Sequence, residues 1–123
     1  MSKRNVALFL IFGLSVFVFA KADLKENIVV IEKKIEKLNM DLGCVTDQNC
    51  VALPYGHKPC GGPRHYLVVS KNNQNFKEIS GLTERLEILE RRAAESSGLV
   101  STCDMAIEPS VYCSQSKCAR KDL

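Results

Sequence analysis

Two stretches of the chain carry hydrophobic residues at alternating steps of three and four positions, which is the spacing of one face of an α-helix. In the first stretch these positions are Leu24, Ile28, Ile31, Ile35, Leu38 and Leu42. In the second stretch they are Ile79, Leu82, Leu86, Leu89 and Ala93. The pattern predicts one amphipathic helix from about residue 24 to 42, ended by Gly43, and another from about Asn75 to Ser96.

Shorter hydrophobic runs between and after these helices predict β-strands. Cys50–Leu53 ends at a proline, and Tyr66–Ser70 is rich in aromatic and β-branched residues. The segment from Val111 to Arg120 contains a polar pair, Gln115-Ser116, which predicts a hairpin with a tight turn. We therefore expect an α+β fold in which two amphipathic helices pack on one small, mainly antiparallel sheet made of these strands.

The first 22 residues follow a different pattern. Two basic residues precede an apolar run from Val6 to Ala20, and the run ends in Ala20-Lys21-Ala22. This arrangement is typical of a secretory signal peptide with an A-x-A cleavage site. The run is shorter than the roughly 20 apolar residues that a membrane-spanning helix needs, although an uncleaved anchor is the alternative. We expect residues 1–22 to be a signal peptide and residues 23–123 to form a single domain, exported to the periplasm or secreted.

The charge of the expected mature chain does not point to a particular partner. The first 22 residues carry three of the 17 basic residues and none of the 14 acidic residues, so the remainder has equal numbers of both. A chain without net charge has no overall attraction to nucleic acids or anionic lipids. We therefore expect neither a nucleic acid partner nor a stable membrane anchor after cleavage, which leaves a protein partner.

Six cysteines follow the expected cleavage site. They are Cys44, Cys50, Cys60, Cys103, Cys113 and Cys118. An even number of cysteines in an exported chain predicts disulfides, here three, but the sequence does not select among the pairings that six cysteines allow. We favour Cys60–Cys103, Cys50–Cys118 and Cys44–Cys113, because these pairs tie the central loop to the end of the second helix and the first strand to the terminal hairpin.

Cysteine chemistry other than disulfide formation finds little support in the spacing. Zinc ligands usually come in closely spaced pairs, and only Cys113 and Cys118 approach that spacing, without a matching second pair. Cys60 lies between His57 and His65, a combination that suits a thiol nucleophile with a histidine base, but a disulfide at Cys60 would remove the thiol. We therefore predict no metal site, no cofactor and no enzymatic activity.

The loop Pro54–His65 is the best candidate for contact with a partner. Its prolines and glycines interrupt regular structure, and Gly61 and Gly62 are expected to adopt positive φ in a turn beside Cys60. The loop side chains without an evident structural role are Tyr55, His57, Lys58, Arg64 and His65. Tyrosine and arginine are enriched in binding hot spots, and a cross-linked loop loses little entropy on binding. We predict that these five side chains bind a partner, with a purely structural loop as the alternative.

A turn of sequence Cys60-Gly61-Gly62-Pro63 precedes the aromatic strand Tyr66–Ser70. Together with the C-x₅-C and C-x₄-C spacings, this CGGP turn resembles uncharacterised small exported bacterial proteins that are rich in cysteine. The resemblance extends from Cys44 to about Cys118. It implies export and a disulfide-bonded α+β domain, and it carries no activity or site residue that could be transferred.

Three classes of function remain open. The first is an exported binding module, such as an inhibitor of a hydrolase in the cell envelope or in a host, that acts through the loop Pro54–His65. The second is a structural or assembly protein that associates through the hydrophobic stripes of its helices, since such stripes can form a coiled-coil seam. The third is a small hydrolase or redox enzyme. We favour the first class.

Overall fold

The structure, a computed structural model, describes residues 23–98 and 103–121. An N-terminal helix (residues 23–38) comes first. The later elements are η1 (Asp47–Asn49), β1 (Cys50–Tyr55), β2 (His65–Ser70), α2 (Phe76–Ser97), β3 (Ser110–Ser114) and β4 (Lys117–Lys121). The expected signal peptide lies outside the described residues. Within the described ranges, no helix has the length and apolar character to cross a membrane.

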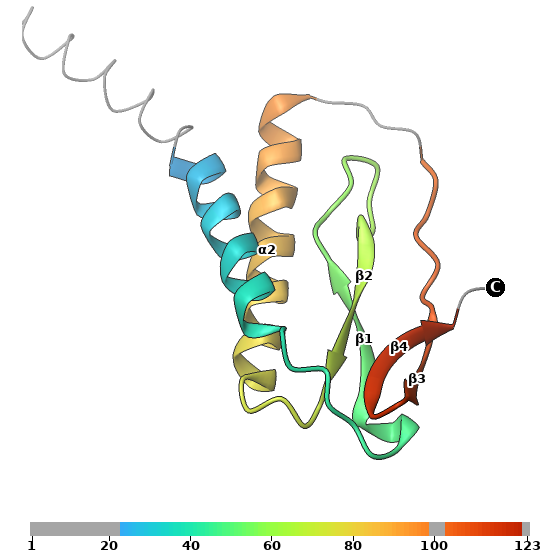
Figure 1. The fold of residues 1–123 in the computed structure, drawn as a ribbon. Helices are drawn as coiled ribbons and strands as arrows, with labels where there is room; N and C mark the ends of the chain where they lie inside the picture. The colour runs from blue at the N-terminus through green and yellow to red at the C-terminus, as the bar shows by residue number, and fades with distance from the viewer. Residues whose placement is uncertain (1–22, 99–102, 122–123) are drawn as a thin grey trace, which may run out of the picture.

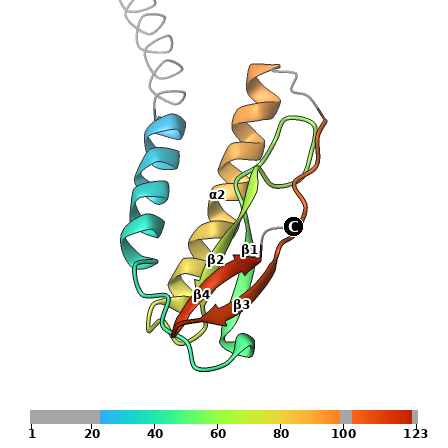
Figure 2. The ribbon, with the colours of Figure 1, turned by 45° about the vertical axis from the view of Figure 1, so that its right-hand side comes forward.

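The predicted α+β fold class is confirmed, with two helices and short antiparallel strands. Figure 1 shows the two helices side by side, with the β1–β2 hairpin next to them and the β3–β4 hairpin beyond it. Figure 2 shows the same arrangement after a rotation, with the β3–β4 hairpin crossing in front of β1. The second helix is continuous across Gly81 and ends at Gly98, whose φ of 61° lies in the left-handed region.

The expectation of one sheet is wrong, because the strands form two separate sheets. β1 pairs only with β2 and β3 only with β4 among the described strands. The backbone near the tip of the second hairpin pairs instead with the segment that follows the N-terminal helix. Cys44 N donates to Ser116 O at 3.1 Å, and Cys118 N donates to Leu42 O at 2.8 Å. These bonds attach the terminal hairpin to residues 42–44 rather than to an edge of the first sheet.

The main hydrophobic core joins the two helices and the first sheet. It consists of Ile31 and Ile35 from the N-terminal helix, Val69 from β2, and Ile79 and Leu86 from α2. Burial of an aliphatic side chain contributes about 1.5–3 kcal/mol, so this cluster is a principal source of stability. The hydrophobic stripes that predicted the helices therefore face each other within a single chain.

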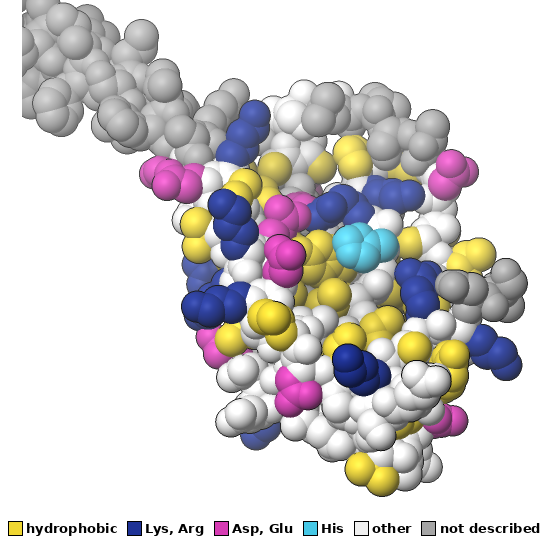
Figure 3. Space-filling model, viewed as in Figure 1, with side chains coloured by type: hydrophobic (Ala, Val, Ile, Leu, Met, Phe, Trp, Pro, Cys, Tyr) yellow, Lys and Arg dark blue, Asp and Glu magenta, His cyan; other side chains and the backbone are white. Residues whose placement is uncertain are grey.

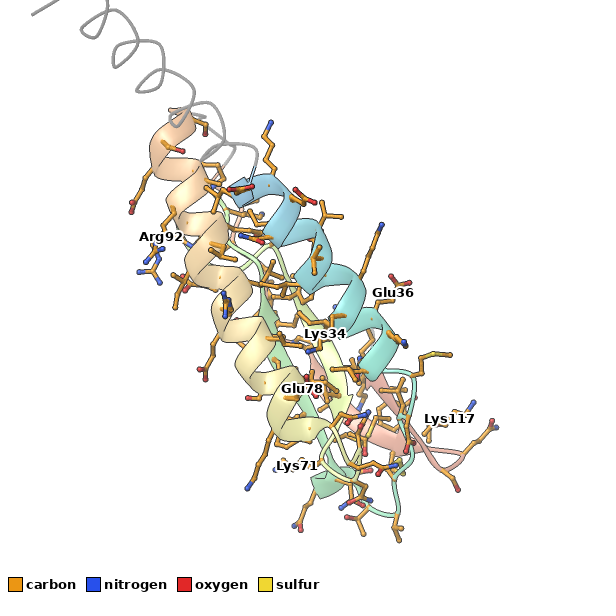
Figure 4. The ribbon with its side chains drawn as sticks, turned by 90° about the vertical axis from the view of Figure 1, so that its left-hand side faces the viewer. Lys34, Glu36, Lys71, Glu78, Arg92 and Lys117 are labelled. Carbon is orange, nitrogen blue, oxygen red and sulfur yellow. A yellow bond between two sulfur atoms is a disulfide. The ribbon has the colours of Figure 1, made fainter. Side chains whose placement is uncertain are left out.

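An ion pair also links the two helices at the surface. Lys34 Nζ lies 2.7 Å from Glu78 Oε1, and Figure 4 shows the two side chains meeting between the helices. Both side chains are about half exposed, so the pair contributes little to stability, on the order of 0–1 kcal/mol. The ion pair is nevertheless compatible with the packing of the two helices in the hydrophobic core.

The N-terminal helix ends at residue 38, four residues before the expected end. The side chain of Asn73 explains this, because its Nδ2 donates to Leu38 O at 2.9 Å and to Asp41 O at 3.1 Å. Carbonyl groups at a helix end have no partner within the helix and need one from outside. Asn73 supplies that partner from the turn before α2, so the helix does not need to continue to Gly43.

Strand β1 continues through Pro54 to Tyr55, beyond its expected end at Leu53. Tyr55 O accepts a hydrogen bond from Arg64 N at 3.0 Å, so the backbone of Tyr55 faces β2. Backbone groups alternate in direction along a strand, and the nitrogen of Pro54 therefore faces away from β2. At that position the missing N–H of proline removes no bond between the strands.

We expect replacement of Asn73 by alanine to lower the free energy of unfolding by about 1–3 kcal/mol, because it removes the donor of two partly buried hydrogen bonds to the carbonyl groups of Leu38 and Asp41. The side chain of Asn73 is buried, with 4% exposure. Asn72 is its exposed neighbour and provides the matched control, for which the Asn72→Ala change should stay within about 0.5 kcal/mol. Denaturant unfolding of the oxidised proteins measures both values. Equal effects of the two substitutions would contradict the assigned role of Asn73.

Candidate functional site

The loop between β1 and β2 contains a tight turn at the CGGP sequence. Gly61 N donates to Lys58 O and Lys58 N donates to Gly62 O, both at 2.9 Å. Gly61 and Gly62 have φ values of 108° and 76°, which confirms the predicted positive φ. A Cβ at either position would meet no atom within 4 Å, so these glycines are required by backbone conformation alone.

Arg64 joins this loop to both helices. Its Nη2 lies 2.6 Å from Glu32 Oε1 of the N-terminal helix and 2.7 Å from Glu90 Oε1 of α2. Its Nε donates to Glu90 Oε2 at 3.0 Å. Burial alone would lower the pKa of Arg64, but the hydrogen bonds and charges of Glu90 and Glu32 raise this pKa above its ordinary value. The guanidinium is therefore a fixed positive charge between two carboxylates.

Gly56 lies against this ion-pair network and was missed by the sequence analysis. Its φ is 73°, and a Cβ at this position would overlap the Glu90 carboxylate and the Nε of Arg64. The same carboxylate accepts a hydrogen bond from the backbone N of His57 at 2.5 Å. A side chain here would force the Glu90 carboxylate and the Arg64 side chain to shift, in addition to the strain of a side chain at positive φ. A glycine immediately after a strand, followed by a charged loop, was the available signal in the sequence.

Three of the five predicted binding residues have structural contacts, so the prediction that they lack a structural role is wrong for them. Arg64 bridges the helices, as described above. His57 is 14% exposed at its side chain, and its Nδ1 lies 3.4 Å from Glu87 Oε1. Lys58 Nζ donates to Asp104 O at 2.5 Å, next to the Cys60–Cys103 disulfide. These contacts hold the loop to α2 and to the segment that follows it.

Tyr55, Arg64 and His65 meet at a groove between the N-terminal helix and the first hairpin. The ring centroids of Tyr55 and His65 are 4.6 Å apart, and Cζ of Arg64 lies 5.4 Å from the centre of the Tyr55 ring. The groove has a volume of about 460 Å³. Its lining consists of Glu32, Ile35, Glu36, Asn39, Tyr55, Arg64, His65 and Leu67. Figure 3 shows hydrophobic side chains at the base of this face, with acidic, basic and histidine side chains around them.

The surroundings of the two ring side chains in the groove disfavour their charged forms. Burial, followed by the charge of Glu32, raises the pKa of Tyr55 above its ordinary value. Burial, followed by the charge of Arg64, lowers the pKa of His65 below its ordinary value. The groove therefore combines two rings whose charged forms are disfavoured with one guanidinium and the carboxylates of Glu32 and Glu36. His57 and Lys58 are not part of this lining, so the structure separates them from the other three residues.

All three favoured disulfide pairings are confirmed. The Cα–Cα distances are 5.9 Å for Cys44–Cys113, 5.4 Å for Cys50–Cys118 and 5.6 Å for Cys60–Cys103. These distances lie within the usual range for disulfides. All six cysteines are therefore bonded, and Cys60 offers no thiol to the histidines on either side of it.

Comparisons with protein-family models, curated proteins and solved structures give no match to this chain. The resemblance to exported proteins with a CGGP turn remains a prediction. The groove and the loop behind it are the features from which we infer a function.

We expect Gly56→Ala to destabilise the protein more than Gly61→Ala. The change at Gly61 adds only the strain of a side chain at positive φ, about 1–3 kcal/mol, whereas the change at Gly56 adds a clash with Glu90 and Arg64. The difference should shrink in an Arg64→Ala background, because part of the clash is then removed. Denaturant unfolding measures the loss of stability in Gly56→Ala and Gly61→Ala, each with Arg64 and with Arg64→Ala. Equal losses for Gly56→Ala and Gly61→Ala would show that the network does not require a glycine.

Proposed function

We propose that this protein is an exported binding module, of the kind that inhibits a hydrolase, and that its partner contacts the groove through Tyr55, Arg64 and His65. One observation carries the proposal: these three residues, selected from the sequence as a binding set, meet on one groove with side chains of the N-terminal helix. Tyrosine and arginine often dominate the free energy of protein–protein binding. The groove therefore has the composition of a binding hot spot.

The rigidity of the groove supports the same proposal. Glu32 of the N-terminal helix and Glu90 of α2 both form ion pairs with Arg64. The guanidinium is thereby oriented before a partner arrives, through the contacts at 2.6 and 2.7 Å. A side chain that is already ordered loses less entropy on binding, so more of the contact energy appears as affinity.

The other two classes of function find less support. Association through the helix stripes needs exposed hydrophobic residues, but Ile35, Ile79 and Leu86 are at most 1% exposed within their own chain. A thiol enzyme needs a free cysteine, and Cys60 is bonded to Cys103. Three disulfides are compatible with a small protein stabilised for life outside the cytoplasm. We therefore retain the exported binding module.

The test compares partner recovery by the oxidised domain with recovery by groove variants. Extracts of the cell envelope and the culture medium supply the candidate partners. The groove variant is Tyr55→Leu with His65→Ala, which leaves the ion pairs of Arg64 intact. The matched control is Tyr112→Ala, because Tyr112 is an exposed tyrosine on β3, outside the groove lining. Melting temperatures of all variants are measured in parallel to detect unfolding. His65→Ala alone is included as a second groove variant, because His65 is exposed and its replacement should not unfold the protein.

We expect the groove variant to recover at least about tenfold less of a partner that the wild type and Tyr112→Ala retain, which corresponds to about 1.4 kcal/mol. His65→Ala alone should show an intermediate loss. Equal recovery by the wild type and both groove variants would contradict the proposal. An equal loss with Tyr112→Ala would place the contact elsewhere and would contradict it as well.

A further inference from the structure

Four of the six cysteines gather in one place beneath the terminal hairpin. The Sγ atoms of Cys44, Cys50 and Cys118 all lie within 4.8 Å of one another, and each of these residues is at most 7% exposed. The sulfur of Cys113 is bonded to that of Cys44, so it lies next to this group, although it is not one of the three sulfur atoms that are all within 4.8 Å of one another. In the sequence, the pair Cys113 and Cys118 had no matching second pair. The fold supplies one by placing Cys44 and Cys50 opposite.

Each of these two pairs, Cys44 with Cys50 and Cys113 with Cys118, lies on a short loop, and the disulfides run from one loop to the other. The loop from Cys44 to Cys50 is closed by Asn49, whose Oδ1 accepts hydrogen bonds from Val45 N and Thr46 N, both at 2.9 Å. The loop from Cys113 to Cys118 is closed by the tight turn at residues 115–116, where both residues have positive φ. The spacing within each pair is therefore set by local backbone structure.

Hydrogen bonds also hold the two loops together independently of sulfur. Cys44 N donates to Ser116 O, and Cys118 N donates to Leu42 O. In addition, Cys113 N donates to Oδ1 of Asp47 at 2.9 Å. Three hydrogen bonds thus join the loops within a few residues of the cysteines. After reduction the hairpin loses its disulfide attachment, and these hydrogen bonds are the contacts that favour its return to the same place, with the four thiols close to one another.

We propose that, in the reduced protein, Cys44, Cys50, Cys113 and Cys118 bind one zinc ion as a four-thiolate site. This inference concerns a different part of the molecule from the groove and does not depend on the proposed function. Zinc bound tetrahedrally by sulfur at about 2.3 Å requires sulfur atoms separated by about 3.8 Å. In the oxidised protein the sulfur atoms of Cys50 and Cys118 are bonded, and Cys44 Sγ lies within 4.8 Å of both. Side-chain rotations after reduction would therefore be enough to reach the zinc spacing. The neighbouring side chains of Leu42, Val68 and Val111 would shield the ion from water.

Both disulfides must be reduced before zinc can bind. A dithiol supplies two electrons and two protons to each disulfide and is itself oxidised to a disulfide. The two cross-links then become four thiols. Zinc displaces the four thiol protons as it binds, because the thiolate is the ligand. Reoxidation by a disulfide reverses the process, restores the two cross-links and releases the ion.

The test measures zinc in the full domain before and after reduction. The protein is reduced with a dithiol without oxygen, freed of reductant, dialysed against buffer with zinc and analysed for bound metal. We expect one zinc per chain in the reduced protein and none in the oxidised protein. Cobalt in place of zinc should give the visible absorption of a tetrahedral site and strong thiolate-to-cobalt charge-transfer bands.

Two double variants identify the ligands. Cys60→Ser with Cys103→Ser removes the third disulfide and should leave one zinc per chain, so it is the matched control. Cys50→Ser with Cys118→Ser should weaken zinc binding by more than about 100-fold. This exceeds the usual loss when a residue that only hydrogen-bonds to a metal ligand is replaced. Cys118→Ser alone keeps three thiolates and should retain cobalt bands of lower intensity.

Several results would overturn the proposal. They are the absence of zinc from the reduced wild type, equal zinc in the oxidised protein, and zinc that persists in the variant without Cys50 and Cys118. Loss of zinc from the control variant would assign the metal to other ligands and would also overturn it.

Discussion

The terminal hairpin is held to the rest of the chain by sulfur rather than by aliphatic packing. Of the residues in β3 and β4, Cys118 alone is buried. The cluster beneath the hairpin consists of Cys44, Cys50 and Cys118, with partly buried neighbours around them. The two disulfides connect residues 69 and 68 positions apart. In the chain-entropy model the first of them to form contributes about 4 kcal/mol, and the second contributes less because it then closes a much shorter loop. The hairpin therefore depends on them.

The β1–β2 hairpin is anchored by different interactions at its two ends. At one end, Cys50 is bonded to Cys118 and pairs in register with Ser70. At the other end, Arg64 forms ion pairs with carboxylates from both helices. The aliphatic core lies between these ends and includes Val69. The groove with Tyr55 and its neighbours lies at the ion-pair end, and Arg64 and Glu32 of the ion-pair network are part of its lining.

The sequence predicted the helices, the strands and the disulfide pairing, because each has a local signal or follows from joining neighbouring elements. It did not predict the separate sheets, the early end of the N-terminal helix or the role of Gly56. These features depend on side chains that meet across long stretches of sequence. Asn73 and Leu38 are 35 residues apart, and Arg64 and Glu90 are 26 apart. Hydrophobic periodicity carries no information about such contacts, and so the structural role of Arg64 was not predicted.

The most direct test of this account is the disulfide map of the oxidised protein. The protein is digested at acidic pH, where thiolate concentrations are too low for exchange, and the linked peptides are identified by mass spectrometry. The account predicts three linked pairs, Cys44–Cys113, Cys50–Cys118 and Cys60–Cys103. Local pairs such as Cys44–Cys50 with Cys113–Cys118 would contradict it, because the terminal hairpin would then have no covalent attachment to the rest of the domain.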